Sequence, residues 1–225
     1  LSCCTFVYKY DTHTENSSFV VMTLPLSHPF TSIVCGPTGC GKTRWIFRLI
    51  ENADKIISPS PTRILYCYGE YQALFAKYPG VEFNDGLPDI SKFDGKEPTL
   101  LIIDDLMNET NSDVEKIFTR MSHHRNLSVV FLMQNLFPKN KYARTISLNA
   151  HYMVLFKNPR DAGQFGVLAK QMYPGGSQFA VESYKDATDA PYGYLLVDLK
   201  PDTDESYRLR TNIFPGELTQ VYIKK

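Results

Sequence analysis

The sequence predicts an α/β fold, a sandwich of helices around a mostly parallel central sheet, with a C-terminal β-hairpin. Two observations indicate this class. Short, continuously apolar runs alternate with stretches whose apolar residues recur at helical spacing. The last two apolar runs, 192–199 and 207–214, are joined by a polar turn containing Pro201, Asp202 and Asp204, which is typical of an antiparallel hairpin.

The first half of the chain contains three predicted strands and one predicted helix. The run 30–35 is apolar, rich in β-branched residues and followed by Gly and Pro, which favours a buried parallel strand. Residues 42–52 place apolar side chains on one helical face and precede the breaker-rich SPSP at 58–61. Strands are predicted at 64–68 and at 99–103, where TLLII is apolar throughout, as in a strand covered on both faces.

The second half continues the alternation of helices and strands. Ser112 and Glu115 form a capping box, and apolar residues follow at i, i+3, i+4 and i+7, so a helix is predicted from 112 to about 123. Strands are predicted at 128–133 and 152–156, and a helix at 162–172.

Length and composition fit one compact domain. A chain of 225 residues with 43% hydrophobic residues buries enough surface to fold without disulfides or metals. Lys plus Arg (24) equals Asp plus Glu (24), which argues against binding to nucleic acid through bulk charge alone. We expect a single domain over 1–225, with its core at about 26–215 and a peripheral N-terminal segment at 1–25.

The cysteines and the apolar runs predict an intracellular protein without a membrane partner. The five cysteines are odd in number and form neither a CxxC pair nor a zinc pattern: Cys3, Cys4, Cys35, Cys40 and Cys67. No apolar run approaches the roughly 18 residues of a membrane span, and the first residues lack the pattern of a signal peptide.

A phosphate-binding loop is the most informative motif. Residues 36–43 read GPTGCGKT and match GxxxxGK[ST] between a predicted strand and a predicted helix, so a chance glycine turn is much the weaker interpretation. Glycines let backbone N–H groups turn inward toward phosphate oxygens, Lys42 supplies positive charge, and the Thr43 hydroxyl is a ligand for Mg²⁺. The predicted nucleotide-binding residues are Gly36, Pro37, Thr38, Gly39, Cys40, Gly41, Lys42 and Thr43.

Polar side chains follow two of the predicted strands. Asp104 and Asp105 end the TLLII strand, at the sheet edge where ligands bind. We expect Asp104 to hold Mg²⁺ and Asp105 to orient or deprotonate the attacking water, although either could instead cap the following turn. Gln134 ends the SVVFLM strand and could sense the γ-phosphate or position the water, or be an ordinary turn residue.

Four segments in this order resemble one superfamily of proteins. They are GPTGCGKT at 36–43, LLIIDDLM at 100–107, HHRNLSVVFLMQNLF at 123–137 and RTISLNAHYMVLFKNPRD at 144–161. Together they resemble the FtsK/HerA superfamily of P-loop motor ATPases, and within it the poxvirus-type genome-packaging ATPases of DNA viruses and Polinton-like elements. The resemblance runs from about 30 to 214; the glutamine strand followed by NLF is its most specific part.

The resemblance implies a motor that hydrolyses ATP and packages a viral genome. Such proteins form homo-oligomeric rings, hexameric or pentameric, that thread double-stranded DNA of any sequence into a capsid. It implies ATP and Mg²⁺ as cofactors, a capsid or portal partner, and a location in the virion or at the viral assembly site. Carried over by position, Lys42 and Thr43 match the phosphate and metal positions, Asp104 and Asp105 the acidic motif, and Gln134 the sensor.

The resemblance also implies an arginine supplied by the neighbouring subunit. It must be a planar, permanently charged donor able to reach the γ-phosphoryl group. Arg125, just before the glutamine strand, is the first choice, and Arg144 and Arg160 are the alternatives. Each of the three could instead be an ordinary surface arginine or part of a salt bridge.

Charge is segregated along the sequence although the total is zero. Residues 82–115 hold ten acidic residues against two lysines, a balance of −8, and residues 116–160 hold eight basic residues and no acid. A basic stretch of this kind fits contact with phosphate, either DNA in a pore or a neighbouring subunit. Lys139 and Lys141 are the first candidates for sequence-independent DNA contact.

Other functions remain open at this stage. Another P-loop NTPase, such as a helicase-like motor or a nucleoside kinase, would share the loop, although the arginine-rich lid of a kinase is not evident in the sequence. A non-hydrolysing nucleotide-binding protein of ring assembly is a third hypothesis. It has little need of both Asp104 and Asp105.

Overall fold

The computed structural model describes residues 6–9, 19–21, 24–89, 93–104, 112–121, 125–137, 141–160 and 163–224. The chain divides into two compact units. The first unit consists of 1–24, 35–52 and 152–225, and the second unit of 25–34 and 53–151. The prediction of a single domain with its core at 26–215 stays a prediction.

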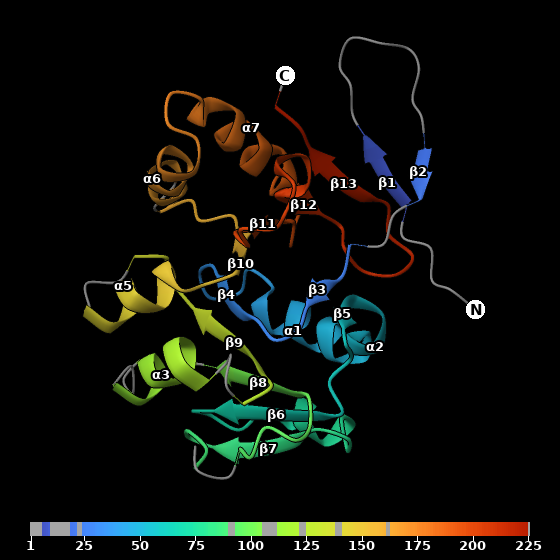
Figure 1. Cartoon of the computed structure of the whole chain (residues 1–225), viewed down its shortest axis with the longest axis vertical. Coiled ribbons are helices and arrows are strands. Elements are labelled where there is room, and N and C mark those ends of the chain that lie inside the picture. Colours follow the sequence, from blue (N-terminus) through green and yellow to red (C-terminus); the bar gives the residue numbers. More distant parts are fainter. Residues whose placement is uncertain are drawn as a thin grey trace. The chain divides into compact units, whose positions relative to one another are not determined.

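The second unit is built on parallel strands (Figure 1). The sheet order there is β4-β9-β8-β6-β7, and the pairs β9/β8, β8/β6 and β6/β7 are parallel. The bounds are β4 (Thr31–Cys35, of which Cys35 belongs to the first unit), β6 (Arg63–Tyr68), β7 (Glu82–Asp85), β8 (Thr99–Asp104) and β9 (Leu127–Met133). Because β8 is paired on both sides, its residues from 99 to 103 are all buried.

Short elements complete the second unit. Strands β3 (Leu26–Ser27) and β5 (Ile57–Ser58) form a separate parallel pair, and α3 packs against α5. The remaining bounds are α2 (Ala53–Ile56), η1 (Ala73–Lys77), α3 (Ser112–Lys116), the π-helical turn η4 (Ile117–Met121) and α5 (Lys141–Leu148).

The first unit has a sheet of different character. Its order is β2-β1-β13-β12-β11-β10, and only the β1/β13 pair among the described pairs of this unit is parallel. The strands are β1 (Phe6–Lys9), β2 (Phe19–Val21), β10 (Tyr152–Phe156), β11 (Tyr194–Asp198), β12 (Leu209–Thr211) and β13 (Thr219–Tyr222). The helices are α1 (Lys42–Glu51), α6 (Gly163–Met172), α7 (Ser177–Ala187) and the short η5 (Glu205–Tyr207). Helix α7 packs on α6, β11 and β12 (Figure 1).

The α/β class, the parallel central strands and the C-terminal hairpin are confirmed. Every predicted strand is present with bounds within two residues, apart from the hairpin, whose strands are shorter, and β11 and β12 pair antiparallel. The helix predicted at 112–123 begins at Ser112 but passes into the π-helical turn η4. Helices α5 and α7 and strands β1, β2, β7 and β13 were not predicted, since their apolar patterns are short or interrupted by polar residues.

Helix α1 is held in the first unit by aromatic packing. It buries Trp45, Ile46, Phe47 and Leu49. The Trp45 ring meets Tyr194 and Phe214 edge-on, with centroids 5.9 and 5.5 Å apart. This packing fixes the start of α1 relative to β11 and to the segment that follows β12.

A buried ion pair joins the hairpin strands β11 and β12. Arg210 is 1% exposed and Asp198 4% exposed, and Arg210 Nη2 lies 2.7 Å from Asp198 Oδ2. The other carboxylate oxygen accepts from the Lys200 N–H and the Thr203 hydroxyl. Burial lowers the pKa of Arg210, and the facing Asp198 opposes this shift. The Asp198 carboxylate therefore neutralises the Arg210 guanidinium, which is buried away from water.

No helix in the part of the chain that the structure describes combines the length and apolarity needed to cross a membrane.

We predict that Asp198→Ala destabilises the first unit by about 3–5 kcal/mol, because the substitution leaves the Arg210 charge buried and unpaired. Urea denaturation followed by the fluorescence of Trp45, the single tryptophan, measures the change. Glu205→Ala is the matched control, because it breaks the Arg208–Glu205 ion pair, in which the Glu205 side chain is 72% exposed. The expected loss of unfolding free energy in this variant is below about 1 kcal/mol. Equal losses in the two variants would contradict the assigned role of the buried pair.

Candidate functional site

The GPTGCGKT loop follows β4 and leads into α1, as its pattern predicts. Gly39 has φ 80° and Gly41 φ 110°, values that L side chains rarely adopt. Gly41 is the N-cap of α1 and accepts the Trp45 N–H at 2.9 Å. The loop therefore ends at a helix N-terminus whose first N–H groups have no partner within the helix, which is the arrangement that binds phosphate oxygens.

The loop backbone lies very close to its surroundings in the first unit. A Cβ at Gly36 would be 2.6 Å from Cys40 Sγ and 2.8 Å from Phe156 Cβ. A Cβ at Gly41 would be 2.9 Å from Tyr192 Cδ1. Glycine at these positions is thus required by packing, and at Gly41 also by backbone conformation.

Lys42 and two cysteines set the electrostatics of the loop. Lys42 Nζ donates to the carbonyl oxygens of Gly36 (2.6 Å) and Pro37 (3.2 Å), which holds its ammonium group against the loop. Burial raises the pKa of the Cys40 thiol and raises that of Cys35 to about 12. Both thiols are therefore neutral near pH 7, and neither adds a negative charge to a loop built for anions.

The remaining loop positions match the small residues that the motif needs. Thr38 and Gly39 are exposed, whereas Pro37, Cys40 and Thr43 are partly buried. Thr43 lies in the first turn of α1, so its hydroxyl belongs to the same helix end as Lys42. The loop and Asp104 belong to different units.

Asp104 ends β8 and is held by a tyrosine from the neighbouring strand. The Tyr66 hydroxyl donates to Asp104 Oδ2 at 2.5 Å. Tyr66 is fully buried, and its ring packs against Phe75 and Phe83. Burial and the adjacent Asp104 carboxylate raise the pKa of Tyr66 far above its ordinary value, so the hydroxyl remains a donor at any working pH. The sequence indicated Asp104 but contained no signal for its partner.

Gln134 follows β9 directly and is exposed. Because β8 and β9 are adjacent and parallel, with Ile103 paired to Phe131, Gln134 follows its strand at the same sheet edge as Asp104. The glutamine strand β9 lies beside the TLLII strand β8, which is the arrangement that a sensor role of Gln134 would need; that role stays a prediction. Asp105 lies outside the described residues, and its role stays a prediction.

The three candidate arginines differ in their surroundings. Arg125 precedes β9, at the opposite end of that strand from Gln134, and its Nη1 donates to the Phe93 carbonyl at 2.7 Å. Arg144 is exposed on α5, and Arg160 is exposed in the turn after β10. To act on a neighbouring subunit, Arg125 would have to break its hydrogen bond to the Phe93 carbonyl.

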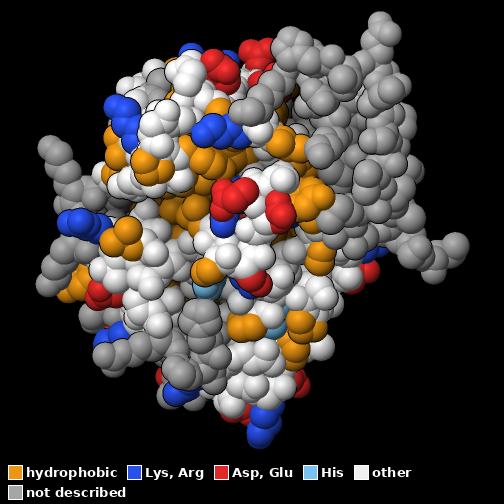
Figure 2. Space-filling model, turned by 45° about the horizontal axis from the view of Figure 1, so that its top comes forward, with side chains coloured by type: hydrophobic (Ala, Val, Ile, Leu, Met, Phe, Trp, Pro, Cys, Tyr) orange, Lys and Arg blue, Asp and Glu red, His pale blue; other side chains and the backbone are white. Residues whose placement is uncertain are grey.

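Basic and acidic side chains are interspersed in the described residues. Lys116 of the basic stretch pairs with Asp113 of the acidic stretch (2.8 Å), and Glu82 of the acidic stretch pairs with Arg63, which lies outside both (2.7 Å). Figure 2 shows blue and red side chains alternating over one face rather than forming separate fields. Lys139 and the Lys141 side chain lie outside the described residues, and DNA contact by them stays a prediction.

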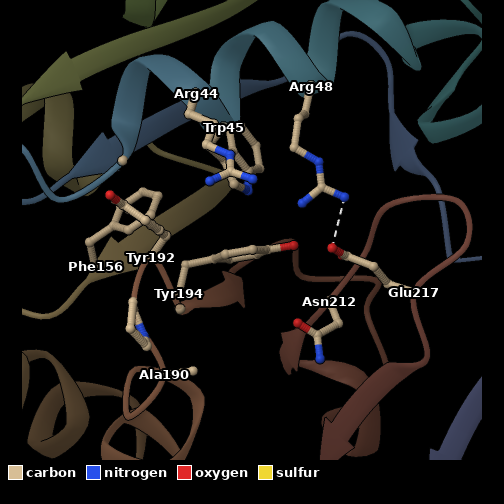
Figure 3. Close-up of a pocket in the computed structure, with 12 residues that line it drawn as sticks. Arg44, Trp45, Arg48, Phe156, Ala190, Tyr192, Tyr194, Asn212 and Glu217 are labelled. Carbon is tan, nitrogen blue, oxygen red and sulfur yellow. Dashed lines mark ion pairs between the residues drawn. The ribbon is translucent and has the colours of Figure 1, made fainter.

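A cavity of about 250 Å³ adjoins the loop within the first unit (Figure 3). Side chains of α1, the turn before β11 and the segment after β12 surround it. Its lining consists of Gly41, Arg44, Trp45, Arg48, Phe156, Ala190, Pro191, Tyr192, Gly193, Tyr194, Asn212 and Glu217. Of these residues, only Gly41 belongs to the site predicted from the sequence. The one further signal in the sequence is an aromatic residue within the turn-forming sequence PYG at 191–193.

The two side chains expected to hold Mg²⁺, Thr43 and Asp104, belong to different units, and their joint binding of the ion stays a prediction. This ion is generally held by one or two protein oxygens together with substrate phosphates, rather than by a protein cage. The Thr43 hydroxyl and the Asp104 carboxylate are oxygen donors of this kind. No group of three or more His, Cys, Asp or Glu side chains suited to a metal occurs within the described ranges.

The fold is similar to that of a viral protein of known structure, the genome packaging NTPase B204 from Sulfolobus turreted icosahedral virus 2 in complex with sulfate. The match has a TM-score of 0.50 and 16% identity and covers 78% of this chain and 95% of that chain. The same NTPase in complex with AMPPCP gives a TM-score of 0.48 at 15% identity over the same shares. The KaiC-like protein PH0186 from Pyrococcus horikoshii OT3 gives 0.46 at 13% identity, over 87% of this chain and 91% of that chain.

No protein-family model matches the sequence, and no curated protein matches it. The B204 likeness, at 16% identity, is evidence for the fold. It confirms the P-loop α/β sandwich expected from the resemblance to the FtsK/HerA superfamily.

We predict that Gly36→Ala lowers the free energy of unfolding of the first unit by about 1–3 kcal/mol, because the new methyl group would overlap Cys40 and Phe156. Urea denaturation followed by Trp45 fluorescence measures this loss of unfolding free energy. Gly166→Ala is the control: this α6 glycine has no atom within 4 Å of an added Cβ, so alanine should raise stability by up to about 1 kcal/mol. Unchanged stability in Gly36→Ala would mean that the loop accommodates a side chain there.

We predict that Tyr66→Phe lowers the free energy of unfolding of the second unit by about 1–3 kcal/mol, since it removes the hydrogen bond to Asp104 and keeps the ring. Denaturation followed by circular dichroism measures the loss. Tyr68→Phe, on the same strand and also packed on Phe75, controls for the loss of a hydroxyl near this aromatic cluster and should cost less. A smaller loss in Tyr66→Phe than in Tyr68→Phe would show that the bond to Asp104 contributes little.

Proposed function

We propose that the chain is an ATP-hydrolysing motor that translocates double-stranded DNA and packages a viral genome into a capsid. The observation that carries the proposal is the GPTGCGKT loop: positive φ at Gly39 and Gly41, a helix N-terminus at Lys42, and a lysine ammonium held against the loop. These features suit a chain of phosphates rather than a single carboxylate. The fold shared with a genome packaging NTPase supports the motor assignment.

The loop residues would bind and orient the triphosphate. Backbone N–H groups from Thr38 to Thr43 would surround the phosphate oxygens, and Lys42 would exchange its carbonyl partners for the β- and γ-phosphates. The Gly36 and Pro37 carbonyls compete for that ammonium group, so phosphate must outbind them. This competition favours a highly charged ligand.

The acids at the end of β8 would complete the site. The Thr43 hydroxyl and the Asp104 carboxylate would hold Mg²⁺, which would supply positive charge that offsets the phosphate charge. The Tyr66 hydroxyl keeps one Asp104 oxygen in place. Asp105 would orient or deprotonate the attacking water, and Gln134 would sense the γ-phosphate from the adjacent strand.

A neighbouring subunit would supply the last group in a homo-oligomeric ring. An arginine acting in trans is the expected donor toward developing charge on the γ-phosphoryl group. Arg125 is the first candidate by position in the sequence, while the exposure of Arg144 and Arg160 supports those two. Basic residues of 116–160, with Lys139 and Lys141 first, would contact DNA phosphates independently of sequence. A capsid or portal protein is the expected partner, at the viral assembly site in the host cell.

We predict that the chain hydrolyses ATP and that duplex DNA stimulates the turnover. Lys42→Ala should reduce turnover at least a hundredfold, because it removes the charge that binds the γ-phosphate. Lys170→Ala, an exposed lysine of α6, is the matched control and should hydrolyse like the parent. Phosphate release with and without DNA, at low and high salt, measures these rates.

Three outcomes would contradict parts of the proposal. An assembled oligomer without turnover would favour the non-hydrolysing assembly protein. Turnover unaffected by DNA would count against translocation while leaving the ATPase assignment intact. DNA affinity that does not fall as salt rises would remove phosphate contacts as the mode of binding.

A further inference from the structure

We propose that the cavity beside the phosphate loop is a binding site for the purine base of the nucleotide, with Tyr192 as its stacking surface. This inference rests on the proposed function and adds a base-recognition site to it. The cavity and the loop share Gly41, so a ligand whose phosphates lie in the loop can extend directly into the cavity. Both lie within the first unit.

The volume of the cavity suits part of a ligand. Pockets that take a whole drug-sized molecule have roughly 300–1,000 Å³. The cavity beside the loop is smaller, at about 250 Å³, and the buried rings of Trp45 and Tyr194 form part of its wall. A flat heterocycle attached to phosphates held outside the cavity is the fragment that such a space admits.

Tyr192 has the properties of a stacking surface. It is 57% exposed although it lines the cavity, and the Arg44 guanidinium lies 5.4 Å from the centre of its ring. Figure 3 shows Arg44 and Tyr192 on the α1 side of the cavity, with the Tyr192 ring next to Phe156 in this view. An aromatic ring already held by a cation offers its plane to a base at little further ordering cost.

The backbone of the cavity wall is strained at two positions. Tyr192 has φ 63° and Asn212 has φ 56°, and they are two of the three described non-glycine residues with positive φ. A bulky residue such as tyrosine is uncommon there, and strain of this kind concentrates at ligand sites. The two strained residues come from different segments of the chain and both line this one cavity.

A polar group in the wall matches the amino group of a base. Glu217 Oε1 pairs with Arg48 Nη2 at 2.7 Å. The other oxygen, Oε2, is buried and has no hydrogen-bond partner among the residues that the structure describes. An exocyclic amino group, as in adenine, would donate to this oxygen. Figure 3 shows Tyr192 and Glu217 on opposite sides of the Tyr194 ring. The two-ring face of a purine offers more area for stacking on Tyr192 than the single ring of a pyrimidine.

The test compares ligands with and without a base on the full chain. Calorimetry measures the affinities of the β,γ-methylene analogues of ATP and CTP and of inorganic tripolyphosphate. The parent should bind the ATP analogue at least about tenfold more tightly than tripolyphosphate, which has no base. It should also bind the ATP analogue more tightly than the CTP analogue, whose single ring offers less area for stacking. Tyr192→Ala should lose about tenfold or more for the ATP analogue and leave tripolyphosphate binding unchanged, whereas Tyr192→Phe should bind like the parent.

Two further variants separate this inference from the proposed function. Lys42→Ala should weaken the ATP analogue and tripolyphosphate alike, because it acts on the phosphates. Tyr71→Ala, which removes a tyrosine of similar exposure (61%) in the second unit, should change neither affinity.

A parent that binds none of the ligands would overturn the proposed function and this inference with it. A parent that binds the ATP analogue but no more tightly than tripolyphosphate or the CTP analogue would overturn only the base site. Equal loss for the ATP analogue and tripolyphosphate in Tyr192→Ala would also overturn it, since the tyrosine would then act by supporting the loop.

Discussion

The close approach of the phosphate-loop backbone to Phe156 and Tyr192 is the constraint on which the candidate site depends. With 2.6–2.9 Å between hypothetical Cβ atoms and their neighbours, only glycine fits at positions 36 and 41. The same packing places a helix N-terminus, a lysine and a cavity within one small region of the first unit. A loop of ordinary residues would have to move away from β10, and the cavity would lose the wall that Gly41 provides.

The first unit supports this loop with interactions that lie far from it in sequence. Trp45 packs on Tyr194 and Phe214, and the buried Arg210–Asp198 pair ties together the strands that carry the cavity residues. A buried ion pair is weak evidence of net stability, but it strongly disfavours other registers, since any slip would leave a charge unpaired. The pair therefore positions β11 and β12, and through them Tyr192 and Asn212, more than it strengthens the fold.

In the second unit, the candidate site residue Asp104 is positioned by a residue from another strand, Tyr66. Asp104 ends an apolar strand whose pattern is evident in the sequence, whereas Tyr66 reaches it from the neighbouring strand. A tyrosine inside RILYCY is a typical strand residue, and nothing local distinguishes a hydroxyl that meets a carboxylate from one that meets water. The tie between Arg125 and the Phe93 carbonyl is likewise invisible in the sequence, because it joins residues 32 apart.

The sequence alone determined the elements whose physics is local. Continuous apolar runs predicted β4, β8, β9 and β10, and the glycine and lysine spacing predicted the loop and the start of α1, because strand burial and phosphate binding impose residue types at fixed spacing. Only the tertiary structure decided the partner of Asp104, the buried Arg210–Asp198 pair and the cavity lined by Arg44, Tyr192, Asn212 and Glu217. These features join residues 12, 38 and more than a hundred positions apart, respectively for the ion pair, the partner of Asp104 and the cavity, and no local pattern encodes such contacts.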